Sequence, residues 1–196
     1  MHAKTLDRLR TQLLSGRLYS WSDLESHPEL PPEKPGVYTW FFRSILPLIP
    51  VSNCMRRDSR ILLYAGTAPK SSLNKETLRS RIRYHYRGNA EGSTLRLTLG
   101  CLLKSEIGGV LRRVGSGTRM TFGPAEARLT EWMAKNATVG WIELTEPWLL
   151  EDHILATASL PLNIDKNTRH PFCTQLRRLR AEARQHARCL PILKTR

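Results

Sequence analysis

The spacing of apolar residues along the chain predicts a mixture of helices and strands. Four leucines recur at helical spacing in residues 6–14, and a proline-rich loop follows them. Residues 36–42 and 61–65 are rich in β-branched and aromatic side chains, so both runs predict strands, the second of which ends at Gly66. We expect these strands to form an antiparallel pair joined by a long insertion over residues 43–60.

Two tyrosines, Tyr38 and Tyr64, occupy the start of the first predicted strand and the end of the second. Antiparallel pairing brings these two ends together, so we expect the tyrosines to be close neighbours at one end of the sheet. Tyrosines on neighbouring strands are usually packing residues with solvated hydroxyls, so the pair alone does not indicate a catalytic site.

A helix is predicted over residues 77–86, where apolar side chains at i, i+4 and i+8 mark one buried stripe before a glycine. Arg81 and His85 fall on one shoulder of this stripe, and Arg79 and Arg83 fall on the other. Such residues are most often solvated, although an Arg/His pair spaced i, i+4 can also grip one phosphate group.

The rest of the pattern completes the expected set of elements, and a chain of 196 residues suits one domain with a sizeable core. These elements are a helix capped by Ser93 or Thr94, a hairpin over residues 110–122, a helix over 125–135, a strand over 138–144, a helix over 147–158 and a final helix over 174–190.

Glu151 is the most informative position in the helix predicted over residues 147–158. At about 100° per residue it falls within the apolar face of that helix. A carboxylate there is costly unless it is paired or bound to a cation, so it is either a metal ligand or a salt-bridge partner of one of the many arginines. Asn163 follows this helix after a short connection, where a turn-forming asparagine is the default explanation.

Charge adds a functional class to this picture. The chain has 31 Lys and Arg residues against 17 Asp and Glu, a net charge of +14 and a pI near 10.3. Such an excess favours a polyanionic partner, because counterions released from a phosphate backbone drive binding, although a basic surface can also serve solubility alone. Most of the basic residues are arginines, whose forked donors favour phosphate recognition.

Compartment and membrane association are also constrained by the sequence. The four cysteines are far apart and lack the spacing of a zinc site or disulfide framework. Charges in the first ten residues argue against a secretory signal, and the longest apolar run, residues 45–51, is too short to span a bilayer. We therefore expect a cytoplasmic protein with reduced thiols and no membrane association.

Taken in order, these residues resemble the GIY-YIG nuclease superfamily. Gly36-Val37-Tyr38 is similar to the first tripeptide of that family, and Tyr64-Ala65-Gly66 is similar to the second, with alanine in place of the usual branched residue. A second departure is the 43–60 connection, which is longer than in the smallest members. Four further positions resemble the branch of the family that includes certain type II restriction enzymes. They are Arg81, His85, Glu151 and Asn163, the last two of which are 163 − 151 = 12 residues apart.

The resemblance covers about residues 35–172 and implies an α/β (α+β) fold in which helices flank a small three-stranded antiparallel sheet. The strand predicted over residues 138–144 supplies the third member of this sheet. The expected organisation is an N-terminal helix and loop in residues 1–34, the nuclease-like domain in residues 35–172, and a basic C-terminal helix, residues 173–196, packed on that domain.

The resemblance further implies hydrolysis of DNA phosphodiester bonds with one divalent cation, Mg²⁺ or another such as Mn²⁺. Glu151 would be its only direct protein ligand, an arrangement that magnesium tolerates because it keeps several waters. Asn163 would hold the helix of Glu151 or a phosphate oxygen.

The remaining roles follow from the same resemblance. Tyr38 would take the proton from the attacking water, directly or through a hydrogen-bonded neighbour, and Tyr64 would orient the water or the phosphate. A free tyrosine has a pKa of about 10, so Tyr38 needs nearby positive charge, which Arg81, His85 and the metal would supply. Arg81 would also stabilise the charge that builds on the phosphate.

Two other hypotheses remain open: a catalytically silent DNA-binding module with the same fold, and a structural protein whose basic surface binds an acidic protein. The chain shows no second DNA-reading domain, so its specificity is either low or requires a homodimer. Five arginines outside the catalytic set are predicted to bind the nucleic-acid backbone: Arg79, Arg83, Arg112, Arg113 and Arg119.

Overall fold

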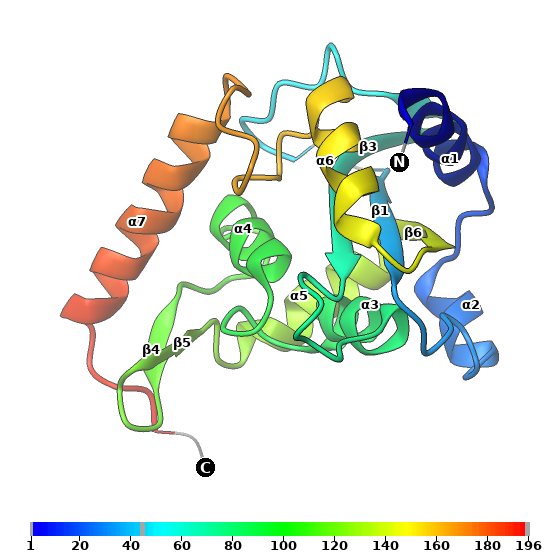
Figure 1. Ribbon diagram of the computed structural model, residues 1–196. Coiled ribbons are helices and arrows are strands. Elements are labelled where there is room, and N and C mark those ends of the chain that lie inside the picture. Colours follow the sequence, from blue (N-terminus) through cyan, green and yellow to red (C-terminus); the bar gives the residue numbers. More distant parts are fainter. Residues whose placement is uncertain (1, 44–45, 195–196) are drawn as a thin grey trace.

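The centre of the molecule is an antiparallel sheet (Figure 1). The computed structural model describes residues 2–43 and 46–194, so residues 44 and 45 of the predicted insertion lie outside the described residues. The sheet has the order β2-β3-β1-β6. Its strands are β1 (Gly36–Phe42), β2 (Arg56–Arg57), β3 (Arg60–Ala68) and β6 (Ala137–Glu143).

The α+β class and the three antiparallel strands are confirmed, with two differences. The sheet has a fourth strand, β2, which is too short at two residues to leave a periodic signal. The expected end of the second strand at Gly66 is wrong, because β3 stays paired with β1 as far as Ala68, opposite Gly36.

The register of β1 and β3 sets the positions of the two tyrosines. Tyr38 pairs with Gly66, and Trp40 pairs with Tyr64, so the tyrosines are diagonal neighbours rather than direct partners. The register shifts after Trp40 and leaves Leu63 as the extra residue of a bulge. Both tyrosine side chains belong to the same core cluster, so they point to the same face of the sheet.

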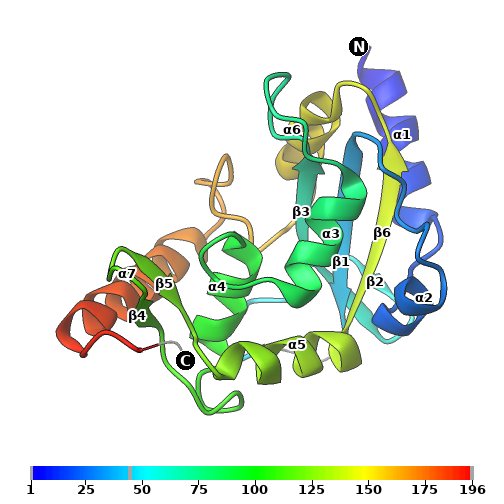
Figure 2. The same cartoon turned by 90° about the horizontal axis from the view of Figure 1, so that it is seen from below.

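Helices cover both faces of the sheet (Figures 1 and 2). On one face, α1 (Ala3–Ser15) and α6 (Pro147–Thr157) pack on each other and on β1. On the other face, α3 (Leu78–Arg87) packs on β1 and β3, and α5 (Ala125–Asn136) packs on α3 and β6. Two separate core clusters result, one on each side of the sheet.

The remaining elements extend the α3 side of the molecule. The hairpin strands β4 (Arg112–Val114) and β5 (Arg119–Thr121) follow α4 (Thr94–Leu102). The basic helix α7 (Cys173–Cys189) packs on α4 and β4, on the side of α4 away from the sheet (Figure 1). The three-part division at residues 34 and 172 stays a prediction.

One further helix, α2 (Trp21–Ser26), was not predicted. Its signal is a capping box in which Ser20 and Asp23 satisfy each other's main-chain N–H groups, followed by too few residues to show a helical period. Within residues 2–43 and 46–194, every helix falls short of the length and hydropathy that a bilayer-spanning segment needs.

Candidate active site

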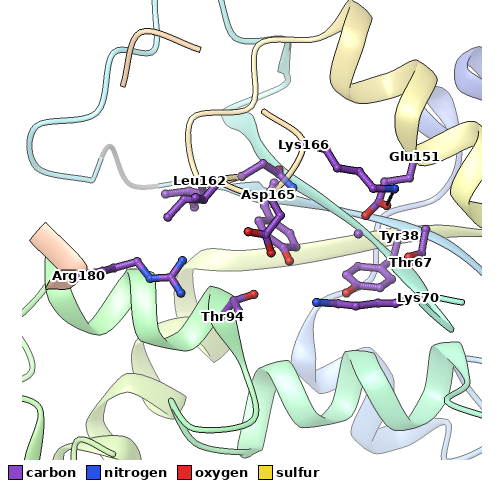
Figure 3. A pocket seen from close by; sticks show the side chains of 13 residues that line it. Tyr38, Thr67, Lys70, Thr94, Glu151, Leu162, Asp165, Lys166 and Arg180 are labelled. Carbon is purple, nitrogen blue, oxygen red and sulfur yellow. Dashed lines mark hydrogen bonds and ion pairs between the residues drawn. The ribbon is translucent and has the colours of Figure 1, made fainter. Parts of the chain in front are cut away.

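A pocket of about 280 Å³ opens between β3, α6 and its following loop, α4 and α7 (Figure 3). Four of the six predicted catalytic positions line it: Tyr38, Tyr64, Glu151 and Asn163. The other two, Arg81 and His85, are buried on α3 behind Tyr38. Sequence reasoning missed six polar side chains of the lining: Thr67, Lys70, Thr94, Asp165, Lys166 and Arg180.

The Tyr38 hydroxyl is held by a buried hydrogen-bond chain. It lies 2.8 Å from Nε2 of His85, and Nδ1 of His85 lies 2.7 Å from Oγ of Ser93. Ser93 is the N-cap of α4, where its Oγ also accepts the N–H of Arg96, which confirms one of the two predicted caps. The chain therefore runs from the pocket through α3 to the start of α4.

The positions on α3 come from its sequence. Thr77 and Ser80 form a capping box that starts this helix, and its predicted stripe of Leu78, Ile82 and Tyr86 is fully buried. Because the stripe faces the sheet, the shoulder with Arg81 and His85 is also buried, at 7% and 0% exposed.

Gly66 makes room for the Tyr38 side chain. A Cβ at Gly66 would lie 2.6 Å from Oη of Tyr38 and 2.8 Å from its Cζ, closer than real Cβ contacts. The tyrosine ring therefore lies directly over the residue with which Tyr38 pairs. The second tripeptide therefore needs a glycine at this position because the Tyr38 ring approaches the main chain closely, and not because the chain turns here.

Arg81 places a positive charge beside Tyr38. Its guanidinium donates to the carbonyl of Gly92 at 3.0 Å and lies 3.5 Å from the carboxylate of Glu76. Arg81 acts electrostatically on the Tyr38 side chain and is not part of the pocket lining.

The buried groups have shifted pKa values. Burial raises the pKa of Tyr38 well above its usual range, and nearby Tyr64 raises it further, while Arg81 lowers it. Burial and the charge of Arg81 hold the pKa of His85 well below its usual range. His85 is thus neutral near pH 7, so Arg81, and not His85, supplies the positive charge expected near Tyr38.

Tyr64 reaches the pocket from β3. Burial raises its pKa, whereas a hydrogen bond with Thr94 at the start of α4 and the charge of Arg81 lower it. Tyr64 thus lies near the start of α4, while the hydroxyl of Tyr38 is hydrogen-bonded to His85 of α3.

Glu151 enters the pocket from α6. It lies at the edge of the buried face of this helix, with its side chain 16% exposed. Burial raises the pKa of its carboxyl, and Lys166, 3.4 Å away, lowers it. The salt-bridge partner in this structure is therefore a lysine of the following loop, which also pairs with Asp152 at 2.7 Å, and not an arginine.

Asn163 fixes this loop to β3. Its Oδ1 accepts the N–H of Ala65 at 3.0 Å, and its Nδ2 donates to the carbonyl of the same residue at 2.7 Å. The Asn163 side chain thus makes the two main-chain hydrogen bonds that a neighbouring strand would make at this edge of β3. The residue that it holds, Ala65, follows Tyr64 in the sequence.

Four of the five arginines predicted to bind nucleic acid have partners within the chain. Arg79 and Arg83 donate to main-chain carbonyls in residues 24–31, and Arg79 also pairs with Glu33. Arg112 and Arg113 likewise donate to the carbonyls of residues 191 and 190. The fifth, Arg119, is exposed, and its side chain has no hydrogen bond or ion pair with the described residues. Nucleic-acid binding by these five stays a prediction.

The fold and the pocket together define the class of this protein. A small antiparallel sheet presents two tyrosines, backed by a buried arginine and histidine, to a pocket with one glutamate. The family model described as the GIY-YIG catalytic domain matches residues 36–182, so the chain belongs to the GIY-YIG family and is a nuclease-type enzyme. No curated protein and no solved structure matches the chain.

Nucleases of this family typically use divalent metals. In the part of the chain that the structure describes, His, Cys, Asp and Glu side chains do not gather in threes as metal ligands. Two carboxylates, those of Glu151 and Asp165, line the pocket together with Thr67, whose buried Oγ1 has no hydrogen-bond partner among the described residues. This donor set fits a hard cation that keeps most of its waters.

Proposed function

We propose that this protein is an endonuclease that hydrolyses phosphodiester bonds in DNA with the help of a divalent cation. The observation that carries the proposal is the hydrogen bond between Tyr38 and a neutral, buried His85, at the wall of a pocket that also contains Glu151. This geometry gives a water molecule in the pocket a route for its proton.

The proton route uses three side chains. His85 is neutral, and with its Nδ1–H donated to Ser93 its Nε2 is free to accept from Tyr38. As a water attacks phosphorus, its proton passes to the Tyr38 oxygen while the tyrosine proton passes to Nε2 of His85. Tyr38 then needs no stable tyrosinate, which its raised pKa disfavours.

Arg81 and Tyr64 assist this step. The fixed charge of Arg81 stabilises negative charge that develops on Tyr38 and, as the family resemblance implies, on the phosphate. Tyr64, which lies near Thr94, orients the water or the phosphate at the opposite side of the pocket.

Glu151 is the residue that would hold the cation, Mg²⁺ or Mn²⁺. The bound ion supplies charge stabilisation of the phosphate and the departing 3′ oxygen. Asn163 keeps the loop after α6 in place and so fixes one wall of the same pocket.

DNA as the substrate is supported by charge. The net charge is +14, and the pocket lining holds three basic side chains, Lys70, Lys166 and Arg180, against the carboxylates of Glu151 and Asp165. We also propose a cytoplasmic location, because all four cysteines are free thiols in the structure.

Nicking of plasmid DNA tests the proposal. The purified protein should cut DNA only with Mg²⁺ or Mn²⁺, and both Glu151→Ala and Tyr38→Phe should lower the rate at least about 100-fold. Tyr84→Phe is a matched control, because Tyr84 is exposed on α3 and its hydroxyl donates to Asn89, outside the pocket lining.

Unchanged cutting by highly purified Glu151→Ala protein would overturn the proposal. Steep salt-dependent DNA binding without cleavage, over several metals and over linear, nicked, branched and single-stranded substrates, would instead indicate a silent binding module. Absence of any DNA affinity at moderate salt would favour an acidic protein partner.

A further inference from the structure

Arg180 is an arginine of α7 that reaches into the active-site pocket (Figure 3). Its Nε atom is buried without a hydrogen-bond partner, and no ion pair with it occurs in residues 2–43 and 46–194. Burial and the neighbouring charge of Arg184 lower its pKa, while Cys101 and Asp165 act in the opposite direction. A half-buried cation thus lies at the wall of the pocket without an ion-pair partner among the described residues, with Asp165 as the other charged group of this lining that acts on it.

Six other described arginines also have a buried Nε without a hydrogen-bond partner, but none of them lines the active-site pocket, and Arg96 shows how a fully buried arginine is paired in this fold. Arg96 is fully buried, and its guanidinium pairs with Glu126 at 2.7 Å and donates to main-chain carbonyls of α3 and α5. Burial of an unpaired charge costs several kcal/mol in general, so a folded chain normally supplies such partners. Arg180 lacks them, and the open side of its guanidinium faces the pocket.

Arg180 is also the first member of a row. Arg184 and Arg188 follow at steps of four residues, so all three lie along one side of α7. The side chain of neither residue has a hydrogen bond or an ion pair with any described residue. Arg184 and Arg188 line a second pocket, between α7, the start of α4 and the β4–β5 hairpin.

The dimensions of this row suit a nucleic-acid strand. From Arg180 to Arg188 the helix rises 188 − 180 = 8 residues, about 12 Å. One strand of DNA carries a phosphate about every 3.4 Å along the duplex axis, so the row spans about three or four phosphates. Its first guanidinium lies in the same pocket as Glu151, where the scissile phosphate would bind.

We propose that Arg180, Arg184 and Arg188 bind successive backbone phosphates of the cleaved DNA strand, and that Arg180 positions the phosphate next to the scissile one. This inference rests on the proposed nuclease function and gives α7 a direct part in substrate binding. The arginines that pair within the chain, such as Arg79 and Arg83, have their donors committed, whereas this row has its donors free.

Salt-dependent binding in a cleavage-deficient background tests the inference. In Glu151→Gln protein without metal, Arg180→Ala should weaken the binding of a DNA duplex about 10-fold and reduce the slope of log K against log salt by about one. Arg180→Lys, which keeps the charge, should restore most of the slope. Arg178→Ala is the control, because Arg178 is exposed on the outer side of α7 and pairs with Glu182.

In the cleaving protein, Arg180→Ala should raise KM and leave the helical content and thermal unfolding unchanged. An unchanged affinity and salt slope in Arg180→Ala, with wild-type cleavage intact, would overturn the inference and leave the nuclease function standing. Equal losses in Arg178→Ala would also overturn it, because the effect would then be one of general charge. A reduced slope in a protein that never cleaves DNA would keep this binding row and reject the nuclease function.

Discussion

The hydroxyl of Tyr38 lies 2.8 Å from Nε2 of His85, and neither side chain has more than 1% of its surface exposed. A strand residue and a helix residue 47 positions apart thus form one buried unit. The histidine is neutral and its other nitrogen contacts Ser93, so Tyr38 and His85 form an uncharged hydrogen-bonded pair at the pocket wall.

The first prediction concerns the stability of the protein at low pH. His85 has a pKa well below 6.5 in the folded state, whereas the unfolded chain protonates near 6.5. The unfolded state therefore binds more protons below that value, and stability, complete above it, is lost as the pH falls toward the folded pKa. Urea unfolding should show a free energy that drops by up to about 1.4 kcal/mol per pH unit below pH 6.5.

The control for this prediction uses two variants, His85→Gln and His170→Gln. His170 also has a pKa lowered by partial burial, so each substitution changes the pH dependence of stability. The difference in unfolding free energy between wild type and His85→Gln gives the contribution of His85, because the contributions of other groups are the same in both proteins. If the two proteins lose stability in parallel between pH 7 and pH 5, the buried neutral state of His85 is wrong.

The second prediction concerns metal affinity. The ammonium group of Lys166 lies 3.4 Å from a carboxylate oxygen of Glu151 and would compete with a cation for it. Since Lys166 is half exposed, this ion pair is worth at most about 1 kcal/mol, so Lys166→Ala should tighten Mn²⁺ binding about two- to five-fold. Calorimetric titration at pH 8 without DNA measures this, and Glu151→Gln should abolish the binding.

A matched lysine separates local competition from net charge. Lys135 is exposed on α5, on the opposite face of the sheet from α6, and Lys135→Ala should leave Mn²⁺ affinity unchanged. Equal gains from both lysine variants would mean that the pair with Glu151 does not limit metal binding.

The third prediction concerns the contact between Gly66 and Tyr38. A Cβ at position 66 would meet Oη of Tyr38 at 2.6 Å, so Gly66→Ala should displace the ring, cost about 1–3 kcal/mol and lower the cleavage rate. In a Tyr38→Phe background the nearest clashing atom is gone, and the same substitution should cost less. A double-mutant cycle by urea unfolding gives the coupling, and additive costs would show that the two residues do not meet.

The fourth prediction concerns Asn163. Asn163→Ala leaves the N–H and the carbonyl of Ala65 without their partners, which should destabilise the fold by about 2–4 kcal/mol. Asn163→Asp keeps the acceptor for the N–H and should cost less. Asn53→Ala, at an exposed loop position, should be neutral, and a neutral Asn163→Ala would show that the loop is held by other contacts.

The elements of the fold were predictable wherever periodicity and end signals agreed. The run that became β1 has the predicted bounds, and α3 carries both a buried stripe and a cap at Thr77. The failures occurred where the signal was short or not local. Strand β2 has only two residues. Strand β3 extends beyond Gly66 because it is paired with a partner strand, and the residue types in 61–65 carry no information about that pairing.

Motif order placed Tyr38, Arg81, His85 and Glu151 near one another in space, and the structure brings them together around one pocket. Their catalytic roles stay predictions. Lys166 and Arg180 were not predicted to lie in the site. Lys166 is in a polar loop and Arg180 is in a basic helix, and in both segments a charged side chain is expected without any functional role. Only the three-dimensional packing of α7 and the loop after α6 brings these two cations to the pocket.

The contact of Asn163 with Ala65 also has a consequence for self-association. The outer edge of β3 would otherwise offer free N–H and carbonyl groups to a strand of another molecule. The main chain of Met55 bonds to Leu62, that of Leu162 bonds to Leu63, and the Asn163 amide covers Ala65, so little of this edge is left for a second copy to extend. A side chain that keeps the pocket wall in place therefore also protects the sheet against edge-to-edge aggregation.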